Sequence, residues 1–293
     1  MFPLALDTLV AQLLNGLVLG MLIALIAMGL SLIFGLMNVI NFAHGAFYAL
    51  GAYLGYTFLY TLKTNFWVAL LLTPFIIGFI GMSVERTLFC RIYNLPHYFQ
   101  LFLSFGLVLA ITEIIRIIFG VIGRPFIKPA ELQFIFNFGL FTFPSYRIFV
   151  LVFTVILAFC VWILLQKTEL GLLIRAGIDD REMAEGLGIN LSNVYTFTFA
   201  LGTGIAGLSG VIGGPLVALH PEMGMDIIIK AFIVVIVGGL GSFRGPIIAS
   251  IILMMISSFF VLIWPPLSDI IIFIFMAIFL LVRPAGLFGG EYF

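Results

Sequence analysis

Residues 9–30 read LVAQLLNGLVLGMLIALIAMGL and contain no charged side chain. A helix that spans a bilayer needs about 20 mostly apolar residues, so this stretch is long enough to cross one. The rest of the chain has the same character, because 63% of its 293 residues are hydrophobic and 9% are charged. Soluble domains are about 45–50% apolar and about 25% charged. The bilayer is therefore the expected solvent of this chain, and the cell inner membrane is its expected location.

Further apolar runs follow along the whole chain. The candidate spans are 9–30, 40–62, 66–85, 98–119, 147–166, 193–219, 227–240, 246–263 and 267–283. The run 227–240 is short for a span, and 31–45 is interrupted by polar residues. We therefore predict an all-α polytopic bundle of eight or nine transmembrane helices in a single domain, 1–293. We expect the first run to be a permanent helix, since a signal peptide begins with basic residues and the first one here is Lys63.

Composition and spacing exclude several function classes. The formal net charge is zero, so there is no basic footprint for nucleic acid. The three histidines and two cysteines are scattered, so no metal site is predicted. No GxxxxGKS/T motif is present, and we expect no cofactor bound by this chain. An intramembrane serine protease is disfavoured and no catalytic residue is predicted, because in those enzymes the histidine follows the GxSG motif, whereas His44 precedes residues 207–210.

Basic residues set the expected orientation, because cytoplasmic loops carry an excess of Lys and Arg. With nine alternating spans, the loops of one side hold seven basic residues and those of the other side hold four. The richer side includes the polar stretch of about 167–192, which we place in the cytoplasm together with the C-terminus. The N-terminus is then external, as is the stretch 120–146, which we expect to be an ordered loop.

The cytoplasmic stretch contains a predicted short helix. Asp179 and Glu182 have the spacing of a capping box, and Gly188 is a natural helix stop. The apolar residues between them are expected on one face: Met183, Ala184 and Leu187. A helix below about 12 residues is marginal in water on its own, so this one needs a partner surface. A connector lying on the membrane is the alternative, although anionic lipid would repel its acidic residues.

Two groups of residues stand out inside the apolar runs. Small residues recur at every fourth position on one predicted helix face: Gly202, Ala206, Gly210 and Gly214. Such a strip allows close helix packing. Polar residues at a spacing of three are also expected on one helix face: Asn38, Asn41 and His44. Two interpretations stay open for them, a lining of the translocation path or an interhelical hydrogen-bond cluster, because polar groups at membrane depth need partners or water.

Charged residues and glycines mark the ends of other runs. Glu113 and Arg116 are expected to pair within one helix. Asp226 and Lys230 are expected on one face, with their charges directed toward the interface. Residues 238–246 have four glycines and a proline, and we predict a tight cytoplasmic turn there.

Three motifs occur at separate places in the chain. Residues 29–45 read GLSLIFGLMNVINFAHG, residues 175–189 read RAGIDDREMAEGLGI, and residues 238–246 read GGLGSFRGP. All three resemble motifs of the branched-chain amino acid ABC permeases of the LivH type, and residues 175–189 are similar to the coupling-helix segment of that family. The three motifs occur in the family's order, and the resemblance covers nearly the whole chain.

The resemblance implies the channel-forming subunit of an ATP-driven importer, which is not itself an enzyme. It implies a second homologous permease subunit, two ATP-binding subunits that use the ATP, and a periplasmic substrate-binding protein. In the family the coupling helix docks on an ATP-binding subunit, and the matching residues here are Arg175, Asp179, Asp180, Arg181, Glu182, Met183, Ala184, Leu187 and Gly188. Branched-chain amino acids are the expected substrate. Alternatives are the same class of permease importing urea, amides or other amino acids, and an ion-coupled secondary carrier that would use Glu113.

Overall fold

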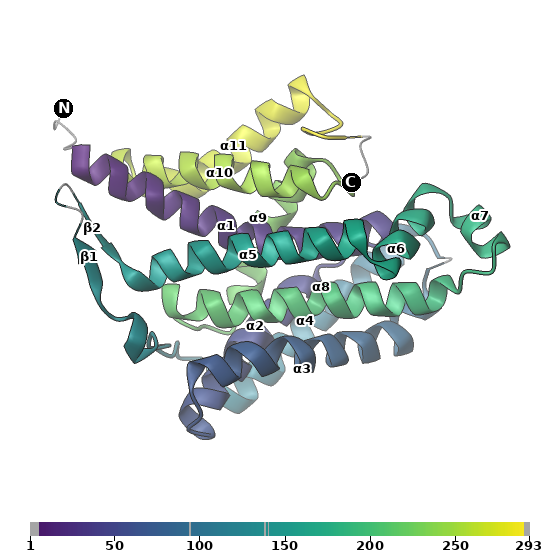
Figure 1. The fold of residues 1–293 in the computed structure, drawn as a ribbon, viewed down its shortest axis with the longest axis horizontal. Helices are drawn as coiled ribbons and strands as arrows, with labels where there is room; N and C mark the ends of the chain where they lie inside the picture. Colours follow the sequence, from purple (N-terminus) through teal and green to yellow (C-terminus); the bar gives the residue numbers. More distant parts are fainter. Residues whose placement is uncertain (1–5, 94, 138, 140, 290–293) are drawn as a thin grey trace.

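The computed structural model describes residues 6–93, 95–137, 139 and 141–289. The chain is built almost entirely of helices (Figure 1). In chain order the elements are α1 (Leu6–Met37), α2 (Ala43–Tyr56), the π-helical turn η1 (Thr57–Thr61), α3 (Phe66–Thr87), η2 (Phe89–Arg91), α4 (His97–Phe119), η3 (Ala130–Leu132), β1 (Ile135–Asn137), β2 (Thr142–Pro144), α5 (Ser145–Lys167), α6 (Glu169–Asp179), α7 (Arg181–Gly186), α8 (Leu191–Gly213), η4 (Gly214–Leu216), α9 (Met223–Gly238), α10 (Arg244–Ile263) and α11 (Leu267–Val282).

The connecting elements gather at opposite ends of the bundle (Figure 1). The strands β1 and β2 form an antiparallel hairpin at one end, with Phe136 paired to Phe143. The helices α6 and α7 project at the other end, beyond α5 and α8. The α6–α7 end is the one that the excess of basic loop residues predicts to be cytoplasmic, and the hairpin end is the predicted exterior.

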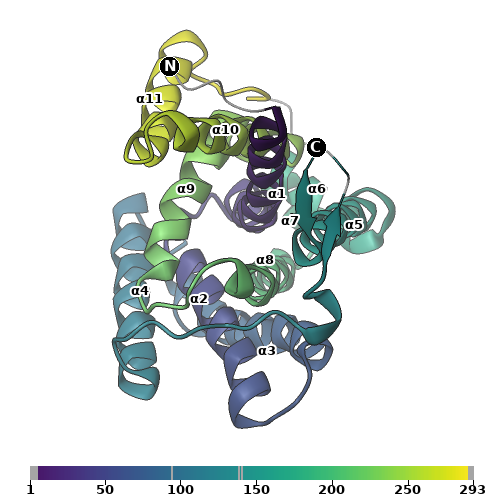
Figure 2. The same cartoon turned by 90° about the vertical axis from the view of Figure 1, so that its left-hand side faces the viewer.

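The helix α8 lies at the centre of the bundle, with α1, α2, α3 and α5 around it (Figure 2). Its small residues face different neighbours, as a methyl group added at each one shows. At Gly202 this group would lie 2.9 Å from the carbonyl oxygen of Gly29 in α1. At Gly210 it would lie 2.7 Å from the backbone nitrogen of Ala52 in α2. The backbone of α8 thus closely approaches the backbones of several neighbouring helices.

The other two members of the predicted strip, Ala206 and Gly214, lie in different surroundings. Ala206 is fully buried in α8. Gly214 belongs to η4 and lies against the ring of Phe126, from the external loop. Gly214 still has α-helical dihedral angles, φ −50° and ψ −47°, and its N–H donates to the carbonyl oxygen of Gly210, so the predicted strip continues to the end of α8 while its members meet different neighbours.

Six described helical segments are long and apolar enough to cross a membrane: Asp7–Met37, Phe66–Arg91, His97–Phe119, Ser145–Lys167, Leu191–Leu216 and Arg244–Ile263. The remaining predicted runs are also helical but shorter, since α2 has 14 residues and α9 and α11 have 16 each. The chain is therefore an all-α polytopic protein, while the predicted eight or nine spans exceed the six that length and composition support among the described residues.

Candidate functional site

The cytoplasmic stretch folds as two short helices instead of the single predicted one. The helix α6 continues through Asp179, and the backbone of Asp180 is extended, with φ −154° and ψ 103°. The carboxylate of Asp180 accepts a hydrogen bond from the N–H of Met183 at 2.9 Å and so caps α7. The predicted capping box that begins at Asp179 is therefore wrong by one residue, because Asp179 is still helical and Glu182 takes the second position of α7.

Gly188 is confirmed as the residue that stops the helix. Its φ is +84°, in the left-handed region that favours glycine. The N–H of Gly188 donates to the carbonyl oxygen of Glu185 at 3.0 Å, and the N–H of Ile189 donates to that of Ala184 at 3.1 Å. These two bonds form a Schellman motif, which satisfies carbonyl groups at the end of α7.

The apolar residues of α7 point in two directions, so the single apolar face predicted for them is wrong. Ala184 is buried against the rest of the chain, whereas Met183 and Leu187 are 61% and 76% exposed. Leu187 and Gly188 line one side of a cavity of about 550 Å³ whose other walls come from α6 and the start of α8. The cytoplasmic end thus presents an apolar side chain beside a hollow.

Charged residues surround this apolar surface. Asp179, Asp180 and Glu182 are exposed. Arg181 forms an i,i+4 ion pair with Glu185 at 3.4 Å. Arg175 has a different role, because its guanidinium donates a hydrogen bond to the carbonyl oxygen of Leu165 and ties α6 to the end of α5.

A chain of aromatic and polar contacts connects α7 to the membrane helices. The guanidinium of Arg181 lies 5.6 Å from the ring centre of Tyr195 in α8. The rings of Tyr195 and Tyr93 meet edge to face at 5.4 Å. The Tyr93 hydroxyl donates to the carboxylate of Glu85 in α3, and the Thr196 hydroxyl donates to the same carboxylate at 2.7 Å. These contacts connect α7 to both α3 and α8.

Sequence reasoning missed this connection, although one signal was available. Glu85 is a carboxylate at the end of the apolar run 66–85, and it is 1% exposed. A buried carboxylate requires hydrogen-bond donors. Burial, together with the hydrogen bond to Glu85, raises the pKa of Tyr93 well above its ordinary value, so this hydroxyl remains a donor at physiological pH.

The chain leaves the helical conformation between α1 and α2. Asn38 has a φ of +51°, and its N–H donates to the carbonyl oxygen of Phe34 at 2.8 Å. Asparagine tolerates this left-handed conformation better than most residues. The prediction that Asn38, Asn41 and His44 share a helix face is therefore wrong, because only His44 lies in α2 and Asn38 is exposed on the other side of the break.

Asn41 and His44 are fully buried beside this break. The Nε2–H of His44 donates to the carbonyl oxygen of Ile26 at 3.1 Å, and the backbone N–H of His44 donates to that of Asn41 at 3.3 Å. Neither amide atom of the Asn41 side chain has a hydrogen-bond partner among the described residues. A buried polar group left unpaired costs about 1–3 kcal/mol, so this amide is available to a ligand or water.

An apolar cavity of about 430 Å³ adjoins the break. Ile40 and Phe42, the two chain neighbours of Asn41, line it together with Phe232 of α9 and Met276 of α11. The two chain neighbours of the unpaired amide therefore border a space that suits an aliphatic group.

Charged groups cluster at the external end of α4 and α9. The predicted pair of Glu113 and Arg116 is confirmed, and Arg116 also binds Glu222, whose pKa this contact lowers. Asp226 and Lys230, expected on one helix face, each have another partner: Asp226 binds His220 and Lys230 binds Asp269, each at 2.9 Å. Burial alone would lower the pKa of His220, but hydrogen bonds to Asp226 and to the Ala218 carbonyl outweigh it, and the pKa is raised.

A bundle of membrane-spanning helices with a broken, polar helix junction inside and an exposed connector at one end is typical of membrane transport proteins. Residues 12–280 match the model of a family described as the permease component of branched-chain amino acid transport systems. The chain belongs to this family of transport permeases, and it is an inner-membrane protein.

Relatives match over nearly the full length. The chain is 28% identical over 295 residues to the high-affinity branched-chain amino acid transport permease BraD of Pseudomonas aeruginosa, covering 95% of each protein. It is 29% identical over 300 residues to the permease LivH of Salmonella typhimurium, covering 95% of this chain and 94% of the relative. A probable LivH of Methanocaldococcus jannaschii is 28% identical, with 92% and 90% covered. No solved structure matches the chain.

Proposed function

We propose that this chain forms the translocation path of an ATP-driven importer of branched-chain amino acids. Its family is the permease component of such transport systems, and the named relatives are permeases for these substrates. The chain pairs with a second, homologous permease subunit. Two ATP-binding subunits dock at the cytoplasmic end and use the ATP, and a periplasmic binding protein delivers the substrate at the hairpin end.

We further propose nine membrane crossings with an external N-terminus. Each of the nine predicted apolar runs contains a described helix, including the shorter α2, α9 and α11. At 1.5 Å per residue, 16 residues extend about 24 Å, which is a few ångströms short of the hydrocarbon thickness. The π-helical turn η1 lengthens α2 in the same direction. Fusion of a reporter enzyme to the C-terminus and to the β1–β2 hairpin tests this topology.

The observation that carries the proposal is the exposed apolar pair on α7. Met183 in α7 and Leu187, which directly follows its end, are more than half exposed, and a helix of six residues cannot be stable alone in water. A protein surface that covers these side chains would stabilise α7, and an ATP-binding subunit is the partner that the family supplies. A movement of α7 would then reach α3 and α8 through Tyr195 and Glu85.

We propose that the translocation path passes the break between α1 and α2. The unpaired amide of Asn41 offers a donor and an acceptor to the charged groups of an amino acid. The adjoining cavity of about 430 Å³ has an apolar lining that suits an aliphatic side chain. We expect Asn41→Leu to reduce transport while the protein still inserts, since this change removes the amide and keeps the number and branching of the side-chain heavy atoms.

The coupling role is tested with Arg181→Glu combined with Leu187→Asp in the reconstituted transporter. We expect uptake of labelled leucine to fall at least about tenfold, the equivalent of about 1.4 kcal/mol, while ATP hydrolysis and membrane insertion persist. The matched control is Arg91→Glu combined with Leu95→Asp, which introduces the same changes at exposed positions of the α3–α4 connection on the same side. Unchanged uptake in the α7 variant, or an equal loss in the control, would contradict the role of α7.

Competition between labelled leucine and unlabelled urea tests the substrate. Leucine transport that urea does not inhibit supports branched-chain amino acids over urea. An ion-coupled carrier is not favoured, because the carboxylate it would use, Glu113, is half exposed at the external end of α4 and is paired with Arg116. Uptake that persists without ATP would contradict the ATP-driven mechanism.

A further inference from the structure

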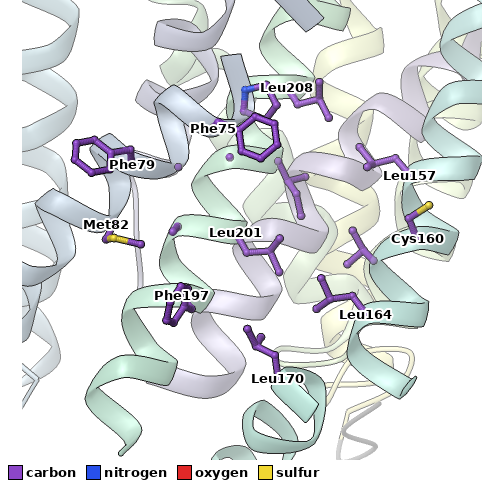
Figure 3. A pocket seen from close by; sticks show the side chains of 16 residues that line it. Phe75, Phe79, Met82, Leu157, Cys160, Leu164, Leu170, Phe197, Leu201 and Leu208 are labelled. Atoms are coloured by element: carbon purple, nitrogen blue, oxygen red, sulfur yellow. The ribbon is translucent and has the colours of Figure 1, made fainter. Parts of the chain in front are cut away.

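An apolar groove opens between α3 and α5, with α8 as its floor (Figure 3). Its volume is about 670 Å³, and no charged side chain lines it. The view along the bundle shows α3 and α5 on different sides of α8 (Figure 2). The close-up shows the side chains that form the two walls and the floor: Phe79 and Met82, Leu157, Cys160 and Leu164, and Leu201.

The length of the groove corresponds to about one leaflet of a bilayer. The groove follows α8 from Phe197 to Leu208, which are 11 residues apart, or about 16 Å at 1.5 Å per residue. The hydrocarbon core of a bilayer is about 30 Å thick, so this is roughly one half of it. This part of the groove is centred on the middle of α8. On α5 the lining runs from Leu157 to Leu164, in the half of the helix that ends at Lys167. With the proposed orientation, the groove therefore extends from the middle of the bundle toward its cytoplasmic end, where acyl chains are the surrounding solvent.

Two basic residues continue the walls beyond the cytoplasmic end of the groove. Arg86 follows Met82 by four residues, and Lys167 follows Leu164 by three, so each lies one turn further on the same helix face. Both are exposed, and neither forms an ion pair with another described residue. Cations therefore stand on both sides of the mouth of an apolar groove.

The nearby acidic residues do not neutralise this mouth. The carboxylate of Glu85 is buried and accepts hydrogen bonds from Tyr93 and Thr196. Glu169 is exposed in the first turn of α6. Among the exposed side chains at the mouth, two cations and one carboxylate therefore leave an excess of one positive charge.

We propose that the groove is a binding site for an anionic phospholipid of the cytoplasmic leaflet. One acyl chain lies along α8 between α3 and α5. The phosphate lies at the mouth, between Arg86 and Lys167. The site selects lipids by headgroup charge, because the apolar walls accept any acyl chain. This inference does not depend on the transported substrate.

The test uses the full chain in lipid vesicles that contain photoactivatable phosphatidylglycerol or phosphatidylcholine with identical acyl chains. The labelled residues are mapped by mass spectrometry. Each basic residue near an anionic headgroup contributes about 1 kcal/mol, which is about fivefold in binding. We expect phosphatidylglycerol to label Cys160 and Leu201 at least about fivefold more than phosphatidylcholine does, and we expect Arg86→Gln with Lys167→Gln to abolish this excess.

The matched control is Arg244→Gln with Arg283→Gln, which removes two exposed cytoplasmic cations at α10 and after α11, away from the groove. We expect it to leave the labelling unchanged. Equal labelling by both lipids, or the same decrease in both double variants, would overturn the proposal, because surface charge alone would then explain the result. Absence of lipid labels from the groove would overturn it too and would favour another protein chain as the occupant. Gel filtration checks that each variant is folded.

Discussion

Gly210→Ala is expected to destabilise the bundle at the contact between α8 and α2. The added methyl group would lie 2.7 Å from the backbone nitrogen of Ala52 and closer still to the carbonyl oxygen of Tyr48. Carbon prefers contacts of about 3.5–4.0 Å, so the two helices must separate by about 1 Å. Backbone atoms cannot rotate away as a side chain can.

The magnitude follows from this separation. A gap of about 0.5–1 Å forfeits roughly a quarter to a half of the dispersion energy of each contact along the seam. Overpacking of this kind costs about 1–3 kcal/mol, and we expect the upper part of that range because both opposing atoms are backbone atoms. Alanine has a higher intrinsic helix propensity than glycine, which offsets about 1 kcal/mol of this overpacking cost. The net loss of unfolding free energy is therefore about 1–2 kcal/mol.

The assay is unfolding of the detergent-solubilised protein by titration with sodium dodecyl sulfate, followed by circular dichroism. The matched control is Gly106→Ala in α4, where a methyl group would meet no atom within 4 Å. The control should be neutral or stabilising, because only helix preference changes. A midpoint for Gly210→Ala equal to that of Gly106→Ala would refute the packing argument.

Three further results are expected. Thr196→Val removes a donor from the buried Glu85 carboxylate and should lower the unfolding free energy by about 1–3 kcal/mol in the same titration. Gly188→Ala places alanine at a φ of +84° and should cost about 1–2 kcal/mol or increase cleavage of the connector by protease, whereas Gly186→Ala, which has open space and an ordinary φ, should not. The raised pKa of His220 gives a contribution that is present below its unfolded pKa of about 6.5 and lost as pH rises through the folded value. A midpoint followed between pH 5 and 9 should show a small loss of under about 1 kcal/mol, absent in His220→Gln.

Hydropathy predicted where the helices lie in the sequence better than it predicted how long each helix is. Each of the nine apolar runs contains a helix, because the bilayer requires every backbone group to be paired within the segment. The lengths of α9 and α11 depend on where the chain turns. Gly239, with a φ of +105°, ends α9, and the extended Trp264 separates α10 from α11. Both breaks have local signals, a glycine in the first case and the prolines Pro265 and Pro266 in the second, because a proline disfavours the helical conformation of the residue before it.

The break after α1 could not be predicted from periodicity. The helix α1 is apolar on all sides, so its sequence does not show where a polar face begins or ends. The left-handed Asn38 was visible only as an asparagine in an apolar run, and this residue type suits several conformations. The cap of α7 shows the same limit, because Asp179 and Asp180 are chemically equivalent and only the course of α6 selects the second.

Burial of Glu85 and the groove between α3 and α5 have no local signal of their own. Both arise where α3 meets α8, and this meeting depends on glycines in sequence segments far apart, such as Gly78 and Gly204. The sequence shows that Arg86 lies one helical turn beyond Met82, but it does not show that a groove lies beside Met82.

The glycine contacts of α8 have a mechanical consequence. Gly202 locks it against α1, Gly207 lies against Ile77 of α3, and Gly210 locks it against α2. A helix wedged on three sides cannot slide or rotate alone, so α1, α2, α3 and α8 must move as a rigid block. Four residues separate α7 from α8, and this short link leaves little slack. In the proposed coupling role, a push that an ATP-binding subunit applies to α7 would therefore be delivered to the whole block.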